Sequence, residues 1–171
     1  MVDEILGKLE AADARIKLRK IRLCQTRVTF LGEEVSRNGW RIGQKFLQAM
    51  EEVQIPDTIK ELRSFLGLAS WQRSFIKSYS ELVEPLQQLT KKGTVLKEVW
   101  KEEHSKAFEQ LKTQFTEAPL IHHPDYGRRF YLYTDASDIG VGGMLTQKSN
   151  IGEDLLLGYF SKKLKPHQIN Y

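Results

Sequence analysis

Apolar residues recur at two spacings along this chain, and each spacing predicts a different class of element. In residues 2–14 and 44–53, apolar side chains lie three or four positions apart, which is typical of a helix with one buried face. In residues 28–35 and 130–147, apolar residues alternate with polar ones, which is typical of strands. Turn residues at 37–39, and glycines within 130–147, divide these strand regions. The pattern therefore predicts two hairpins separated by a helical region.

The helical region has clear start and stop signals. The helix from residue 44 is expected to end before Pro56, because a proline disfavours helical geometry in the preceding residue. Thr58 and Glu61 have the spacing of a capping box, which predicts a new helix start. Gly67 within that helix indicates close packing or a break near residue 71. The predicted core stripe of this helix consists of Leu62, Phe65, Leu66 and Ala69.

Further elements follow toward the end of the chain. Pro85 is expected in the first turn of another helix, and a longer helix is expected between Trp100 and Pro119. Residues 155–160 predict one more strand, and Pro166 could begin a final helix.

Residues 15–23 alternate basic and apolar side chains. Two interpretations fit this alternation equally well. It is either a strand with a solvated face or a strip that faces nucleic-acid phosphates.

The composition is that of an ordinary intracellular protein. The chain has 171 residues, and 26 Lys and Arg against 22 Asp and Glu give a net charge of +4, which permits nucleic-acid binding without proving it. Cys24 is the single cysteine, so an internal disulfide is excluded and a reducing compartment fits. No run approaches the roughly 18–20 apolar residues of a membrane span. We expect a cytoplasmic or nuclear chain that is not secreted and does not contact a membrane.

Asp135 is the strongest candidate for chemistry. It ends a predicted strand among small residues, which leave room for a metal ion or substrate. Two-metal chemistry, however, needs several carboxylates that clamp ions roughly 3.5–4 Å apart. Asp3 and Glu4 are interpreted as acids in the first turn of a helix. Asp138 and Asp154 are more simply solvated, and the segment His122, His123 and Asp125 predicts a turn rather than a metal site.

Several motifs, taken in order, resemble the polyprotein of gypsy-type LTR retrotransposons at the junction between reverse transcriptase and ribonuclease H. Each motif alone is weak, but their shared order covers nearly the whole chain. The motifs are Phe30-Leu31-Gly32, residues 61–68, Arg73 with Phe75-Ile76, Pro85-Leu86, Trp100 with Ala107-Phe108, Ala118-Pro119-Leu120, residues 134–137, Gln147, Ser161 with Leu164, and Asn170-Tyr171.

The resemblance assigns roles to residues of this chain. It implies that Phe30, Leu31 and Gly32 form a primer-grip hairpin, which holds the primer end in such polymerases. It implies that Asp135 is the first metal-binding and catalytic aspartate of the ribonuclease H fold, with Mg²⁺ as the cofactor of the parent enzyme. Exposed basic residues in the helical region are then candidate phosphate contacts, although solvated helix faces look the same. These residues are Arg63, Arg73 and Lys77.

The resemblance also implies an α+β architecture in three parts. Residues 1–43 correspond to the end of the palm with its primer-grip-like hairpin, residues 44–118 to a helical thumb and connection, and residues 119–171 to the first part of a ribonuclease H-like domain. The last part is expected to be a truncated, mixed β-sheet. Such a sheet exposes an edge and an apolar face, so we expect low stability or self-association.

The chain departs from the family pattern at three places. Residues 20–23 lack the usual cysteine and aromatic residue, Gln72 and Ser74 stand where a tyrosine and a positive charge are usual, and Gln168 stands where glutamate is common. The polymerase aspartate pair and the remaining ribonuclease H acids are expected outside this chain.

Three hypotheses for function follow. The main one is a reverse transcriptase/ribonuclease H fragment, catalytically inactive alone, that binds an RNA/DNA hybrid or a template-primer duplex and partners the rest of its polyprotein. The second is a domesticated, non-enzymatic protein-interaction module, and the third is a pseudogene fragment without a role.

Overall fold

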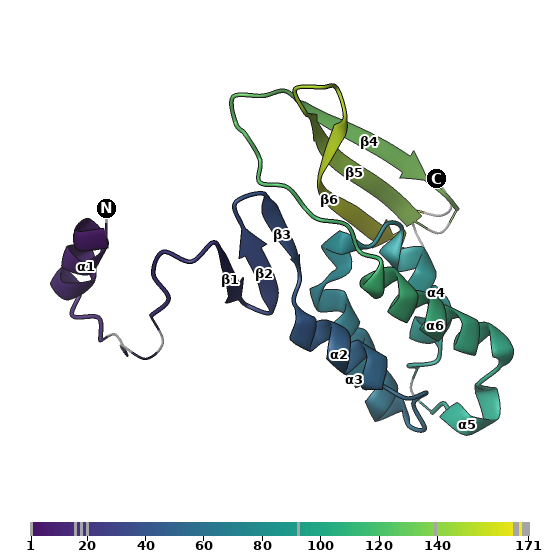
Figure 1. The fold of residues 1–171 in the computed structure, drawn as a ribbon. Coiled ribbons are helices and arrows are strands. Elements are labelled where there is room, and N and C mark those ends of the chain that lie inside the picture. Colours follow the sequence, from purple (N-terminus) through teal and green to yellow (C-terminus); the bar gives the residue numbers. More distant parts are fainter. Residues whose placement is uncertain are drawn as a thin grey trace.

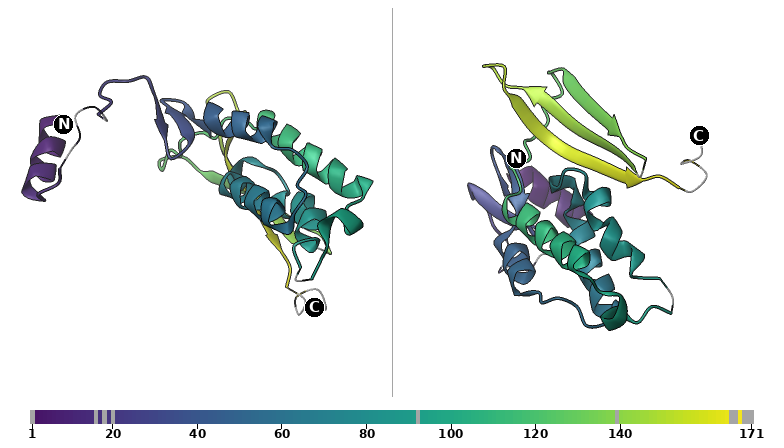
Figure 2. Two further views of the ribbon diagram at one scale, coloured as in Figure 1. Left: turned by 90° about the horizontal axis from the view of Figure 1, so that it is seen from below. Right: turned by 90° about the vertical axis from the view of Figure 1, so that its right-hand side faces the viewer.

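A computed structural model describes residues 2–15, 17, 19, 21–91, 93–138, 140–165 and 168. It confirms the α+β class: a small sheet, a helical region and a second sheet follow one another along the chain (Figure 1). Helix α1 (Val2–Ala11) stands apart from these parts in Figures 1 and 2 and has no buried residue. Among the described residues, no helix is long and apolar enough to cross a membrane.

The first sheet is antiparallel, in the order β1-β2-β3. Its strands are β1 (Arg27–Phe30), β2 (Glu33–Ser36) and β3 (Gly39–Ile42). The predicted hairpin therefore forms, with separate strands where one continuous strand was expected over 28–35. The strand interpretation of residues 15–23 is wrong for the described residues, because residues 15, 17, 19 and 21–23 belong to no strand. Residues 16, 18 and 20 lie outside the described part.

The helical region has one shared core. It contains α2 (Gln44–Glu52), α3 (Ile59–Trp71), the 3-10 helix η2 (Arg73–Phe75), α4 (Tyr79–Gln88), the single turn α5 (Leu96–Val99) and α6 (Glu102–Thr116). Helix α2 ends before Pro56, as predicted. The largest fully buried side chains come from several of these helices. They include Met50, Leu62, Phe75, Leu86, Phe108 and Phe115.

The start of α3 is confirmed in atomic detail. Glu61 N donates to the Thr58 side chain at 3.2 Å, and the Glu61 carboxylate accepts from Thr58 N at 3.2 Å, which together form the predicted capping box. The predicted stripe is also confirmed: Leu62, Phe65 and Ala69 are buried, and Leu66 is half-buried against the same core.

The predicted start of α4 at Pro85 is wrong. The helix begins at Tyr79, so Pro85 lies in its interior, where a proline removes a backbone hydrogen bond. Tyr79, Val83 and Leu86 are buried on one side of α4. Their burial outweighs the cost of the proline and extends the helix in front of it.

The second sheet is antiparallel throughout its described strands, rather than mixed as expected. It pairs β4 (Phe130–Ala136) with β5 (Gly140–Lys148), and β5 with β6 (Asp154–Lys163). In this register Asp135, Gly142 and Ser161 lie in one row. A register shift follows Leu145 in β5. The predicted final helix at Pro166 lies outside the described residues.

The second sheet is attached to both other parts of the molecule. It lies over one end of the helical region in Figures 1 and 2, and β6 contacts α4 and η2. Trp40 of β3 and Ile121 exchange two backbone hydrogen bonds of 2.8 and 2.9 Å, and His122 N donates to Leu156 O at 2.7 Å. Gly39 permits this approach, because a Cβ there would lie 2.0 Å from the Ile121 carbonyl oxygen.

Candidate nucleic-acid interface

Helix α3 has one buried face and one exposed face that suits contact with a polyanion. Arg63, Gly67 and Trp71 follow each other at intervals of four residues, so they form one line along the exposed face. Trp71 is 63% exposed, which is unusual for so large an apolar side chain in a helix that buries its other face well. This line therefore has the properties of a contact surface.

Gly67 is open to solvent rather than packed against a neighbour. A Cβ at this position would meet no atom within 4 Å, so the expectation of close packing is wrong for the described residues. The alternative expectation, a helix break near residue 71, is confirmed by the end of α3 at Trp71. The glycine leaves a flat site between Arg63 and Trp71 where another molecule can approach the helix backbone.

The three predicted basic contacts are all exposed, but they occupy different places. Arg63 Nη2 donates to Thr90 O at 2.6 Å, which orients the guanidinium beside the end of α4. Lys77 lines a hollow of about 700 Å³ between α4 and α6 that also contains the acids Glu81 and Glu109. The environment of Lys77 is therefore mixed in charge and favours phosphate less than that of Arg63.

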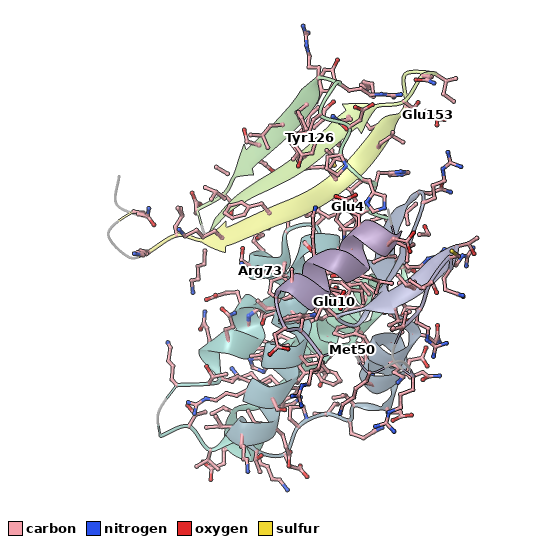
Figure 3. All side chains as sticks on the ribbon, turned by 90° about the vertical axis from the view of Figure 1, so that its left-hand side faces the viewer. Glu4, Glu10, Met50, Arg73, Tyr126 and Glu153 are labelled. Carbon is pink, nitrogen blue, oxygen red and sulfur yellow. The ribbon has the colours of Figure 1, made fainter. Side chains whose placement is uncertain are left out.

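Arg73 lies on the side of the helical region that faces the second sheet. Figure 3 shows it there, and its 3-10 helix contacts β6. Burial raises the pKa of Tyr79 to about 12, and the positive charge of Arg73 opposes this rise. Arg73 thus acts electrostatically on a buried neighbour while its own side chain stays exposed.

The predicted primer-grip residues form a tight turn with an apolar tip. Leu31 and Gly32 connect β1 to β2, and both have positive φ, of 50° and 88°, as a two-residue hairpin of type I′ requires. Phe30 is 62% and Leu31 66% exposed. A positive φ is strained for leucine, so the turn holds this side chain outward at an energetic cost.

Asp135 lies near the end of β4 and is exposed. Its Oδ1 accepts a hydrogen bond from Ala136 N at 2.9 Å. A carboxylate is the ligand type that Mg²⁺ prefers, but a magnesium site combines several oxygen ligands. Among the described residues, no group of three or more His, Cys, Asp or Glu side chains is placed to hold a metal ion. Asp135 fits one position of such a site and the described residues do not complete it.

Helix α4 fastens the end of the sheet that carries Asp135. Ser80 N donates to Ser161 Oγ at 2.9 Å, and Ser137 Oγ donates to Glu81 Oε1 at 2.6 Å. One turn further along α4, Lys163 Nζ donates to Glu84, which is only 9% exposed.

The carboxyl group of Glu84 is held in its charged form. Burial by itself raises the pKa of Glu84, but hydrogen bonds from Lys163 and Gln88, with the charges of Lys163 and Lys91, outweigh it and lower the pKa. No local pattern marks Glu84 as a site residue, because its partner lies 79 residues away. Trp71 was not among the predicted contacts, although its spacing of four residues from Gly67 is visible in the sequence.

The residues that were interpreted as structural behave accordingly. His123 Nε2 hydrogen-bonds to Ser36 O at 2.8 Å, and Asp125 accepts from Gly127 N at 2.9 Å in a turn. Asp154, which was expected to be simply solvated, is exposed but begins β6 and accepts from Thr146 Oγ1 at 2.9 Å and Lys148 Nζ at 3.0 Å. Asp3 and Glu4 lie in the first turn of α1.

Comparison with known proteins identifies related sequences and folds. Residues 100–171 match the family described as the RNase H-like domain found in reverse transcriptase. The chain is 34% identical over 170 residues to the Transposon Tf2-3 and Tf2-4 polyproteins of Schizosaccharomyces pombe. The match covers 99% of this chain and 13% of each polyprotein.

Solved structures with the same fold come from foamy viral protease-reverse transcriptases. One, a dRH form in complex with ds DNA, superposes with a TM-score of 0.79 at 25% identity, covering 98% of this chain and 29% of that one. Another, in complex with an RNA/DNA hybrid, has a TM-score of 0.75 at 26% identity, covering 99% of this chain and 24% of that one.

Proposed function

We infer the function of this chain from the family to which it belongs, the retrotransposon polyproteins that carry a reverse transcriptase with an RNase H-like domain. The main hypothesis of a reverse transcriptase/ribonuclease H fragment is supported by this homology, and the protein-interaction module is not. Within the fragment, we propose that residues 1–43 end the palm, residues 44–118 form the thumb and connection, and residues 119–171 begin the RNase H-like domain.

The proposed function is to hold a template-primer duplex or RNA/DNA hybrid against the exposed face of α3. The observation that carries this proposal is the line of Arg63, Gly67 and Trp71. An arginine can contact a phosphate, an open glycine allows close approach, and an exposed tryptophan can pack against the sugars of a groove. The related reverse transcriptases were solved with such nucleic acids, which supports the assignment.

The exposed turn at Phe30, Leu31 and Gly32 and the basic residues Arg73 and Lys77 are proposed as secondary contacts. Asp135 is proposed to supply one carboxylate to a Mg²⁺ site of the complete enzyme. Its own contribution is to present an oxygen ligand from the end of a strand whose position α4 fixes.

The duplex contact is tested by measuring binding of a fluorescent RNA/DNA hybrid by anisotropy. Trp71→Ala is expected to weaken binding by about 1–2 kcal/mol, roughly 5–30-fold, because an anchoring aromatic side chain is lost. Tyr126→Ala is the matched control, because Tyr126 is 86% exposed but lies on the loop before β4. The proposal is wrong if the unaltered chain shows no binding at low salt, or if both variants bind alike.

A further inference from the structure

The turn that follows Asp135 is shaped by the side chain of Ser137. Ser137 N donates to Gly140 O at 2.9 Å, and Gly140 N donates back to Ser137 Oγ at 3.2 Å. The same hydroxyl donates to Glu81 Oε1 at 2.6 Å, which brings a carboxylate of α4 to the turn between β4 and β5. One hydroxyl group therefore joins the backbone of this turn to the helix.

The carboxylate of Glu81 determines how this hydroxyl is used. A serine hydroxyl has a single O–H donor and two acceptor lone pairs. Gly140 O lies 3.4 Å from Ser137 Oγ and competes for the same proton, but the charged oxygen of Glu81 is closer and forms the stronger hydrogen bond. Donation to Glu81 fixes the direction of the hydroxyl and leaves a lone pair that accepts from Gly140 N.

The first turn of α4 is itself held by the second sheet. Ser78, which precedes the helix, makes no capping hydrogen bond through its side chain, and the N–H groups of a first helical turn lack partners within their helix. Ser161 Oγ of β6 accepts from Ser80 N at 2.9 Å and also hydrogen-bonds to Ser80 Oγ. A residue of the sheet thus caps the helix, and the next helical residue, Glu81, is held beside the turn.

These two contacts lie on either side of Asp135. Ser161 lies in the same row of the sheet, with Gly142 between them, and Ser137 follows Asp135 by two residues. Ala136, whose N–H donates to Asp135 Oδ1 at 2.9 Å, directly precedes Ser137. A displacement of Ser137 therefore also displaces the N–H group that orients the carboxylate of Asp135.

We propose that Glu81 is a positioning residue for Asp135. Through Ser137 it fixes the turn after β4, and with it the direction in which the carboxylate of Asp135 is presented to a divalent cation. The proposal rests on the proposed role of Asp135 as one carboxylate of a Mg²⁺ site. It makes the geometry of that carboxylate depend on the contact between α4 and the second sheet.

The test compares two substitutions of Glu81 in the full chain. Glu81→Ala removes the acceptor of the Ser137 hydroxyl, whereas Glu81→Gln keeps an oxygen that accepts the same hydrogen bond. Both remove one negative charge, so a difference between them reports the hydrogen bond and not the charge. Glu109→Ala is the control, because Glu109 lines the same hollow beside α4 but belongs to α6. Glu81 is exposed, so these substitutions leave the core intact.

Two NMR measurements follow the expected changes. Exchange of the Gly140 amide with solvent is expected to be at least about 5-fold faster in Glu81→Ala than in the unaltered chain, because its acceptor is no longer fixed. Glu81→Gln is expected to restore most of the protection. The carboxyl carbon signal of Asp135, assigned with Asp135→Asn, is expected to shift in Glu81→Ala and to return toward its original position in Glu81→Gln. The amide of Leu111, a fully buried residue of α6, reports global opening and is expected to exchange equally in all variants.

The possible outcomes separate this proposal from the proposed function. Equal exchange of Gly140 in Glu81→Ala and Glu81→Gln, or an Asp135 signal that neither moves, overturns the positioning role. Faster exchange that Leu111 shares also overturns it, because the effect is then a general loss of stability. If Trp71→Ala still weakens hybrid binding in those cases, the proposed function stands. If the Glu81 variants behave as expected but the unaltered chain binds no hybrid at low salt, the proposed contact at α3 fails and the positioning role stands.

Discussion

Gln72 and Gln147 are both buried, and they differ in whether their amides have partners. Gln147 is 2% exposed, and its side chain accepts from Asp125 N at 2.9 Å and donates to Asp125 O at 2.7 Å. Gln72 is fully buried, and neither its Oε1 nor its Nε2 has a hydrogen-bond partner among the described residues. A buried amide without partners costs stability that an apolar side chain would not.

Gln72→Met is therefore expected to raise the free energy of unfolding by about 1–3 kcal/mol, because it removes an unpaired amide while keeping a similar volume. Urea denaturation measures the change. Gln147→Met is the matched control, and it is expected to lower the free energy of unfolding, because the backbone of Asp125 then loses both partners. Equal destabilisation by the two substitutions would show that the Gln72 amide is paired.

The ion pair between Glu84 and Lys163 makes stability depend on pH in a defined direction. The pKa of Glu84 is lowered in the folded chain, so its contribution is present above the unfolded pKa near 4.5 and is lost as the pH falls through the folded value. Lys163→Met is expected to lower the free energy of unfolding at pH 7 by about 1–3 kcal/mol, less than for a fully buried pair, since Lys163 is 43% exposed.

The difference between the unaltered chain and Lys163→Met is expected to shrink between pH 5 and pH 3, in urea denaturation at each pH. Lys162→Met serves as the control, because the side chain of the preceding residue points to the opposite face of β6. A difference that stays constant down to pH 3 would contradict the assigned role of the Glu84 charge.

Among elements, α3 shows what local sequence can determine and α4 what it cannot. The partners of the α3 capping box are three residues apart, so the start of α3 is readable from Thr58 and Glu61 alone. The start of α4 depends on burial of Tyr79 and Val83 against the rest of the helical core, which no local rule around Pro85 contains. The described residues of 15–23 form no strand for the same reason, because alternation of basic and apolar side chains does not form a strand without a neighbouring strand to pair with.

Gly67 in α3 allows folding to be separated from binding. Gly67→Ala is expected to raise the free energy of unfolding by about 0.5–1 kcal/mol, because alanine favours a helix and a Cβ meets no neighbour. The Cβ of Gly67→Leu also meets no neighbour, but the longer side chain extends from the line between Arg63 and Trp71. It is expected to weaken hybrid binding at least 5-fold without loss of stability.

Urea denaturation and fluorescence anisotropy on the same samples measure these two effects of Gly67 substitution. Gln114→Leu provides a comparison at an exposed position of another helix, α6, away from the line on α3. Tight hybrid binding by Gly67→Leu would place the duplex away from this face.

On the scale of the whole molecule, the candidate site could be predicted only in part from the sequence. Asp135 is readable because small residues surround it in the chain, and Arg63 because it lies opposite an apolar stripe. The fastening of the sheet by α4 joins Ser80 to Ser161 and Glu84 to Lys163, pairs about 80 residues apart. Such pairs become visible only when the fold brings the two segments together.

The face of the second sheet opposite α4 leaves large apolar side chains in solvent. Phe130, Leu132 and Phe160 are 41%, 67% and 57% exposed, and Leu132 and Phe160 line a hollow of about 720 Å³. Strand β4 also has one edge without a partner among the described strands. An apolar face next to an open edge favours association between chains.

Replacing Leu132 and Phe160 together by lysine is expected to shift the chain from concentration-dependent association to a monomer in sedimentation velocity. The two charges make burial of this face between chains unfavourable, while their exposure keeps the cost to folding small. Ile151→Lys is the control, because Ile151 is 80% exposed at the tip of the β5–β6 loop, away from the hollow. A compact monomer of the unaltered chain at all concentrations would show that the exposed face does not drive association. Association that persists in the double variant would show that another surface makes the contact between chains. The apolar side chains of α1 are then the next candidate, because none of them is buried.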